Sequence, residues 1–169
     1  MDRYPNVKII AQPLAADWNR EKGTKATENY LSRLGAAPKG KLDFIWGESS
    51  EMAIGAMNAA AHAGVLDDSG GATPPKQGKV AIFSNDVTPE TVSYIKQGKF
   101  IAETTHGFAE WGWFGTEVAV KISCGMHVQK FRDIHPRTAW EGNADLFYPN
   151  PKLPDINWDS IRSHCQGQQ

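Results

Sequence analysis

Residues 80–99, VAIFSNDVTPETVSYIKQGK, give the clearest indication of the fold class. The first four residues of this stretch form a short apolar run of the kind found in buried strands. A polar segment follows, and Thr88-Pro89 then opens a helix, because proline is favoured at the first helical position. Gly98 ends that helix. The stretch therefore predicts a strand, a loop and a helix, which is the repeating unit of an α/β fold.

The same unit recurs on both sides of this stretch. Apolar runs and helical spacing predict strands at residues 7–11, 42–46 and 100–105 and helices at 17–34, 50–64 and 108–122. Asp17 and either Ser49 or Ser50 are suited to cap two of these helices. Such alternation favours a mainly parallel sheet with right-handed crossovers and helices on both faces. We therefore expect an α/β fold, a three-layer Rossmann-like lobe.

Length and composition limit the possible functions. The chain has 169 residues, of which 40% are hydrophobic and 22% charged, enough for one domain or slightly more. Its net charge of −1 offers no basic field for a phosphate backbone, so nucleic acid is not an expected partner. The apolar runs are too short for a transmembrane helix. The first residues hold no apolar signal segment, which indicates a cytosolic protein or one whose targeting segment is not part of this chain.

The two cysteines leave two interpretations open. Cys124 and Cys165 are too few for a disulfide framework or a zinc site. They could form one bridge in an oxidising compartment, but two unpaired thiols are the simpler expectation.

The candidate functional residues lie in four predicted loops. In parallel sheets, ligands bind at the carboxyl ends of the strands, which here means residues 12–20, 47–50, 84–88 and 105–108. Together with the adjoining strand end, these loops carry Trp18, Arg20, Trp46, Glu48, Ser49, Asp86 and His106. The Arg20 guanidinium offers five fixed donors that suit hydroxyls or a carboxylate, and each indole offers a flat apolar face.

Each of these residues also has an ordinary structural role. Ser49 could simply cap a helix, and Asp86 could simply form a turn. Arg20 could be a solvated helix residue. The sequence contains no serine nucleophile elbow, no histidine pair at metal-binding spacing and no glycine-rich phosphate loop. We therefore expect no catalytic residue, no metal and no cofactor, and we do not expect an enzyme.

Four segments together resemble the C-terminal lobe of a periplasmic sugar-binding protein of the ribose-binding type. They are VKIIAQPLAADWNREKG (7–23), FIWGESSEMAIGAMNAA (44–60), VAIFSNDVTPETVSYIKQGK (80–99) and FIAETTHGFAEWG (100–112). The resemblance covers residues 6–122 and implies that Trp18 and Arg20 match an aromatic-x-Arg motif whose Arg contacts sugar hydroxyls. It also implies a ligand-binding role for Asp86.

The sequence departs from the family pattern at two of the matching positions. Ser49 stands where the family has Asn or Asp, so Glu48 could take over that contact. His106 stands where the family often has Gln. These departures imply a ligand other than ribose.

The resemblance also implies an organisation and a role. Residues 1–107 would form the C-terminal-type lobe, and residues 108–169 a helix and an irregular tail, with only a short helix at 158–163, that cross back to an N-terminal lobe absent from this chain. The implied function is half of the ligand cleft of a solute-binding protein that serves an ABC-type sugar or polyol importer, with a transporter permease as partner and a periplasmic or extracytoplasmic location. The alternative is the effector-binding domain of a lactose-repressor-type regulator. The apolar stripe of residues 108–122, left uncovered, suggests a homodimer, whereas a tail folded over the stripe within one chain would keep the protein monomeric.

Overall fold

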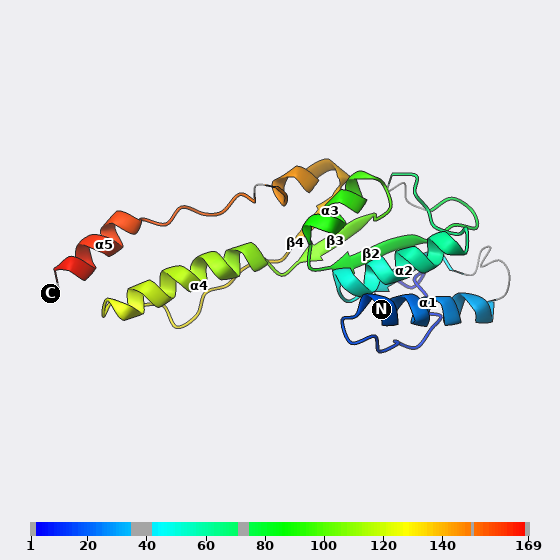
Figure 1. Cartoon of the computed structure of the whole chain (residues 1–169), viewed down its shortest axis with the longest axis horizontal. Coiled ribbons are helices and arrows are strands. Elements are labelled where there is room, and N and C mark those ends of the chain that lie inside the picture. Colours follow the sequence, from blue (N-terminus) through cyan, green and yellow to red (C-terminus); the bar gives the residue numbers. More distant parts are fainter. Residues whose placement is uncertain (1–2, 35–41, 71–74, 150, 168–169) are drawn as a thin grey trace.

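The computed structural model describes residues 3–34, 42–70, 75–149 and 151–167 (Figure 1). The elements follow one another as α1 (Arg20–Leu34), β1 (Phe44–Gly47), α2 (Ser50–His62), β2 (Ala81–Asn85), α3 (Pro89–Lys96), β3 (Ala102–Thr105), α4 (Phe108–Ser123), β4 (Arg137–Trp140), the 3-10 helix η1 (Glu141–Leu146) and α5 (Trp158–Gln166). The predicted succession of strands and helices from residue 42 to residue 122 is confirmed.

A four-stranded mixed sheet forms the centre of the fold. Its strands lie in the order β1-β2-β3-β4, and the first three are parallel to one another. β4 pairs antiparallel with β3. The expected α/β class with a mainly parallel sheet is therefore confirmed, and the parallel strands bring their carboxyl ends to one edge.

The hydrophobic core lies between the sheet and helices α2 and α3. Ile54 of α2, Ile82 of β2 and Val92 of α3 are each at most 1% exposed and belong to one cluster. Their spacing along each element turns one apolar side of the helices towards one face of the sheet. Helix α1 packs in turn on α2 at close range, since a Cβ atom on Gly55 would lie 2.2 Å from the carbonyl oxygen of Arg20. This contact fixes the start of α1 next to α2.

The opposite face of the sheet is open among the described residues. The register aligns Trp46, Phe83, Ala102 and Trp140 in one row across the four strands. Trp46 is 56% exposed and Trp140 is 54% exposed. The expectation of helices on both faces is thus met on one face only, because the helices that contribute to the core pack on the side of Ile82.

The structure corrects two predictions near the N-terminus. Residues 7–11 form no strand, because no described strand pairs with them, and Val7 and Ile9 are more than half exposed. Asp17 does not cap α1, since its φ of 48° takes the chain through a left-handed turn. Asn19 caps the helix instead, accepting the backbone N–H of Lys22 at 2.9 Å.

Helices α4 and α5 form an arm that extends away from the sheet (Figure 1). A disulfide joins Cys124, at the end of α4, to Cys165 in α5, so the expectation of two free thiols was wrong. The Trp113 indole donates a hydrogen bond to the carbonyl oxygen of Pro154 at 2.7 Å, and its ring packs edge-on against Trp158. The tail therefore covers the Trp113 side of α4, while Trp111 and Ile122 stay at least half exposed.

Candidate functional site

The polar residues at the carboxyl ends of β1 and β2 are tied to the start of α2. The Asp86 carboxylate accepts the backbone N–H of Ser50 at 3.1 Å. Ser49 is the N-cap of α2 and accepts the backbone N–H of Met52 at 3.3 Å. Ser49 therefore caps α2, as its position allowed, and the Ser50 N–H at the start of the helix, which has no partner within the helix, is satisfied by Asp86.

Backbone strain is concentrated in two of the predicted binding loops. Among the described residues, four non-glycine residues have positive φ, namely Asp17 (48°), Trp18 (52°), Asp86 (115°) and Val87 (66°). A β-branched residue such as Val87 rarely adopts this conformation, because its side chain crowds the backbone. Strain of this kind costs about 1–3 kcal/mol per residue. It persists where the surrounding structure enforces the conformation, and it is concentrated at functional sites. The Asp86 loop is accordingly a strong candidate for ligand contact.

The surroundings of Asp86 raise the pKa of its carboxyl overall. Partial burial raises the pKa of the Asp86 carboxyl, although the hydrogen bond from the Ser50 N–H and the nearby His106 act in the opposite direction. Glu48 raises the pKa slightly further through its charge. Asp86 is thus a partly buried carboxyl group with one identified backbone donor, the Ser50 N–H.

His106 lies at the end of β3, beside β2. The Asn85 side-chain amide is 2.5 Å from Nε2 of His106. The imidazole also contacts the rings of Phe108 and Trp111, with centroids 5.9 Å and 6.1 Å away. Asn85, Asp86 and His106 therefore form one polar cluster that borders on exposed aromatic rings of α4.

Arg20 lies at the same edge but is already engaged. Its Nε and one terminal nitrogen bind Glu51 at 2.9 Å each, and its terminal nitrogens bind Glu90 at 2.7 and 3.1 Å. These contacts use four of the five N–H groups of the guanidinium. Arg20 thereby connects the first turns of α1, α2 and α3. One N–H of its guanidinium remains for the predicted contact with sugar hydroxyls.

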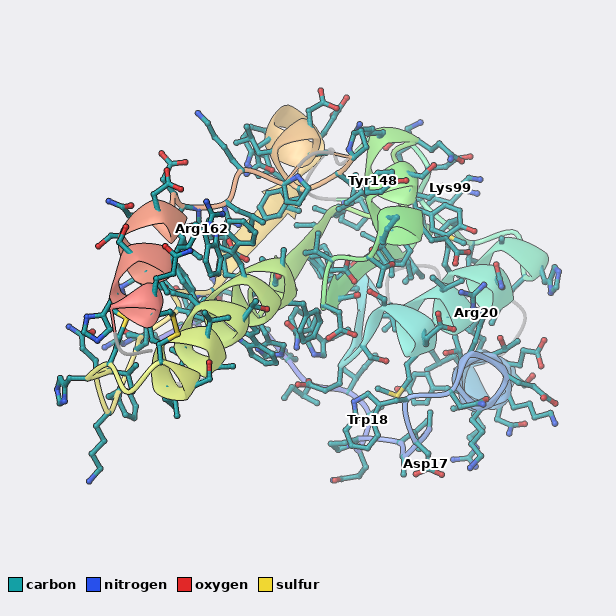
Figure 2. All side chains as sticks on the ribbon, turned by 60° about the vertical axis from the view of Figure 1, so that its left-hand side comes forward. Asp17, Trp18, Arg20, Lys99, Tyr148 and Arg162 are labelled. Atoms are coloured by element: carbon teal, nitrogen blue, oxygen red, sulfur yellow. A yellow bond between two sulfur atoms is a disulfide. The ribbon has the colours of Figure 1, made fainter. Side chains whose placement is uncertain are left out.

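The two predicted indoles occupy different positions. Trp46 donates its indole N–H to Glu48 at 2.9 Å, which joins these two predicted residues at the end of β1. Trp18 is 72% exposed on the loop before α1, next to Asp17 at the margin of the lobe (Figure 2). Both indoles, Trp18 and Trp46, are therefore more than half exposed to solvent.

Sequence reasoning missed one buried residue beneath this edge. Glu103 of β3 is 1% exposed, and its carboxyl accepts hydrogen bonds from Ser50, Ser84 and Thr91. Burial raises the pKa of this carboxyl, and the three hydroxyls partly offset the effect. The available signal was strand alternation, since Glu103 and Thr105 share the inner face of β3.

Comparison with known proteins identifies the family. A family described as periplasmic binding protein domain matches residues 1–126. The chain belongs to the periplasmic binding protein family. Within this family, the ribose import binding protein RbsB of Haemophilus influenzae is 32% identical over 121 residues, which are 72% of this chain and 35% of that protein.

Solved structures of the family share the fold. A periplasmic solute-binding protein of an ABC transporter from Actinobacillus succinogenes, with bound D-allose, has a TM-score of 0.70 at 24% identity, covering 85% of this chain and 45% of that one. A Mycobacterium smegmatis protein in complex with β-D-fucofuranose has a TM-score of 0.69 at 19% identity, covering 98% and 47%. The chain thus spans about a third of the curated relatives' length. The relatives found give no support to the regulator alternative.

No described helix has the length and apolar character needed to cross a membrane. Within the described ranges, no cluster of three His, Cys, Asp or Glu side chains is arranged to hold a metal ion.

Proposed function

We propose that this chain supplies half of the ligand cleft of the solute-binding component of an ABC-type importer for a sugar or polyol. The main support is the cluster of Asn85, Asp86 and His106, which a strained loop holds at the carboxyl end of a parallel sheet. Family membership adds to this support, because the related proteins named above bind sugars or serve in their import.

The chemistry of the site suits a polyhydroxylated ligand. Asp86 and the Asn85 amide offer an acceptor and a donor for hydroxyl groups. The exposed rings of Phe108 and Trp111 adjoin this cluster through His106 and suit the C–H face of a sugar ring. Relatives bind D-allose and myo-inositol, which shows how wide the range of ligands is within this fold. A sugar or cyclic polyol is therefore the ligand class we propose.

The proposed location is the periplasm or another extracytoplasmic space. The Cys124–Cys165 disulfide supports it, because disulfides persist in oxidising compartments. A transporter permease is the proposed macromolecular partner. Binding without chemical conversion is the proposed activity, so the chain would need no cofactor.

A half cleft predicts low affinity. Each hydrogen bond to a charged group that the other half would supply is worth about 1.5–3 kcal/mol. The loss of several such bonds weakens binding by orders of magnitude, so we expect dissociation constants of about 1 mM or weaker.

The proposal is tested by NMR titration of the 15N-labelled chain with D-ribose, D-allose and myo-inositol up to high millimolar concentrations. We expect saturable shifts at Asn85, Asp86 and His106 with at least one of the three. Asp86→Asn should weaken that binding several-fold, whereas Asp145→Asn, which changes an exposed aspartate that pairs with Lys96, should not. Absence of shifts at this cluster, or equal effects of the two substitutions, would contradict the proposal.

A further inference from the structure

Glu103 joins three segments beneath the polar cluster. Its Oε1 accepts the hydroxyl of Ser50, the first residue of α2, at 2.6 Å, and also the hydroxyl of Ser84 in β2. Its Oε2 accepts the hydroxyl of Thr91 in the first turn of α3. One carboxyl group in β3 is therefore bonded to a neighbouring strand and to the starts of two helices.

One of these partners also contacts Asp86. Ser50 binds Glu103 through its side chain and Asp86 through its backbone N–H, at 2.6 and 3.1 Å. The bond from its hydroxyl to Glu103 thus holds Ser50 in place, and the N–H of Ser50 in turn orients the Asp86 carboxylate. Asp86 itself follows β2 directly, and Ser84 anchors that strand to the same carboxyl group.

We propose that Glu103 is a positioning residue, which holds Ser50 and through it aims Asp86 at the ligand. This inference rests on the proposed function, because it takes Asp86 to be a ligand contact. A buried carboxyl group is costly unless its hydrogen bonds are satisfied, and here three hydroxyls satisfy it. An apolar side chain would fill the same space at lower cost, but it would leave Ser50, Ser84 and Thr91 without this acceptor.

Three substitutions separate positioning from general stabilisation. Glu103→Met keeps the length of the side chain and removes the acceptors. Glu103→Gln can keep all three hydrogen bonds, since the amide oxygen can accept from Ser50 and Ser84 while the amide nitrogen donates to Thr91. Ser50→Ala removes only the link between Glu103 and the start of α2. Glu117→Gln is the matched control, because Glu117 is a buried carboxylate in α4 that pairs with Lys121 and Arg132, away from Asp86.

The readouts are taken on the ligand-free chain. Amide hydrogen exchange of Ser50 is measured relative to Ile101, whose N–H bonds to Ile82 in the sheet. The titration of the Asp86 carboxyl is followed by 13C NMR. No sugar is present in these measurements. A negative result for Glu103 would therefore leave the proposed function standing, and a negative sugar titration would not change what these measurements say about Glu103 and Ser50.

We expect Glu103→Met and Ser50→Ala each to accelerate Ser50 exchange about tenfold relative to Ile101, as for one lost hydrogen bond. Ser50→Ala should also raise the titration midpoint of Asp86, because the Ser50 N–H stabilises its ionised form. Glu103→Met is judged by exchange alone, because Glu103 and Asp86 also interact directly through their charges. Combining the two substitutions should add little, and Glu103→Gln should stay close to the parent protein. Ser50→Ala tests the link even if Glu103→Met does not fold. The inference would be overturned if residue 50 exchange and Asp86 titration were both unchanged in Ser50→Ala. Equal effects of Glu117→Gln would overturn it too.

Discussion

The Asp86 carboxylate accepts the backbone N–H of Ser50 across 36 residues of sequence. This bond places a carboxylate at the N-terminal end of α2, where unpaired N–H groups and the helix dipole favour negative charge. It also joins the carboxyl end of β2 to the helix that follows β1. The bond therefore links the side chain that follows β2 to the backbone of the neighbouring strand–helix unit at the candidate site.

Replacing Glu103 by Gln should change how stability depends on pH. Because burial raises the pKa of Glu103, its contribution to stability is complete below the ordinary pKa of glutamate and is lost as the pH rises through the raised value. We expect Glu103→Gln to gain stability relative to the parent between pH 4 and pH 7, by about 1.4 kcal/mol for each unit of pKa shift. Urea unfolding at both pH values measures the difference. A difference that does not change with pH would contradict the expectation.

Replacing Arg20 by Gln should remove the charged partner of the Glu51 and Glu90 carboxylates. Arg20 lowers the pKa of the Glu90 carboxyl, mainly through its hydrogen bonds. The stability that Glu90 contributes is present above its ordinary pKa and is lost as the pH falls through the lowered value. We expect Arg20→Gln to raise the Glu90 pKa, as read by 13C NMR, and to cost about 0.5–1 kcal/mol near pH 7, since the pair is partly exposed to solvent. Lys22 lies on the same helix as Arg20 and forms an exposed pair with Asp17, so Lys22→Gln should leave the Glu90 titration unchanged.

Removing the disulfide should loosen the arm formed by α4 and α5. Cys124 and Cys165 are 41 residues apart, and closing a loop of this length restricts the unfolded chain by about 4 kcal/mol on the chain-entropy model. We expect Cys124→Ser with Cys165→Ser to lower the melting temperature by roughly 8–16 °C if the arm unfolds together with the lobe. If the arm unfolds separately, Trp158 should instead become exposed well before the sheet melts, which tryptophan fluorescence detects. An unchanged melting curve with Trp158 still packed on Trp113 would contradict both outcomes.

The exposed apolar surfaces should cause self-association. The homodimer predicted through residues 108–122 requires the exposed side of α4 that carries Trp111 and Ile122, whereas the open sheet face carries Trp46 and Trp140. We expect light scattering at micromolar concentration to give a mass above 18.6 kDa. Trp111→Lys should restore the monomer if the α4 side mediates contact, and Trp140→Lys should do so if the sheet face does. A monomeric parent chain would exclude both surfaces.

The central part of the fold could be predicted because its signals are local. The apolar run before Ser84 and the Thr88-Pro89 helix start each depend on neighbouring residues, and both elements formed as expected. The segment at 7–11 has an equally apolar pattern but forms no strand. Pairing requires a neighbouring strand, and the pattern of a single segment carries no information about one.

The candidate site was predicted in part for the same reason. Loop position alone predicted that Asp86 and His106 would lie at the same edge of the sheet, since parallel strands end together. The partners of Arg20 were not predictable, because Glu51 and Glu90 lie 31 and 70 residues away in sequence. Glu103 was missed because a charged residue in a short strand suggests exposure, and its burial depends on three hydroxyls from separate elements. Whether the predicted residues touch a ligand stays a prediction.

The bond between Cys124 and Cys165 also affects how this chain tolerates cleavage. The segment between them includes β4, which completes the sheet, and long stretches without regular structure. A peptide bond hydrolysed in that segment would leave two polypeptides still joined through sulfur. The nicked molecule would keep the mass of the intact chain plus one water, and its two pieces would separate on a denaturing gel only after a reducing agent is added.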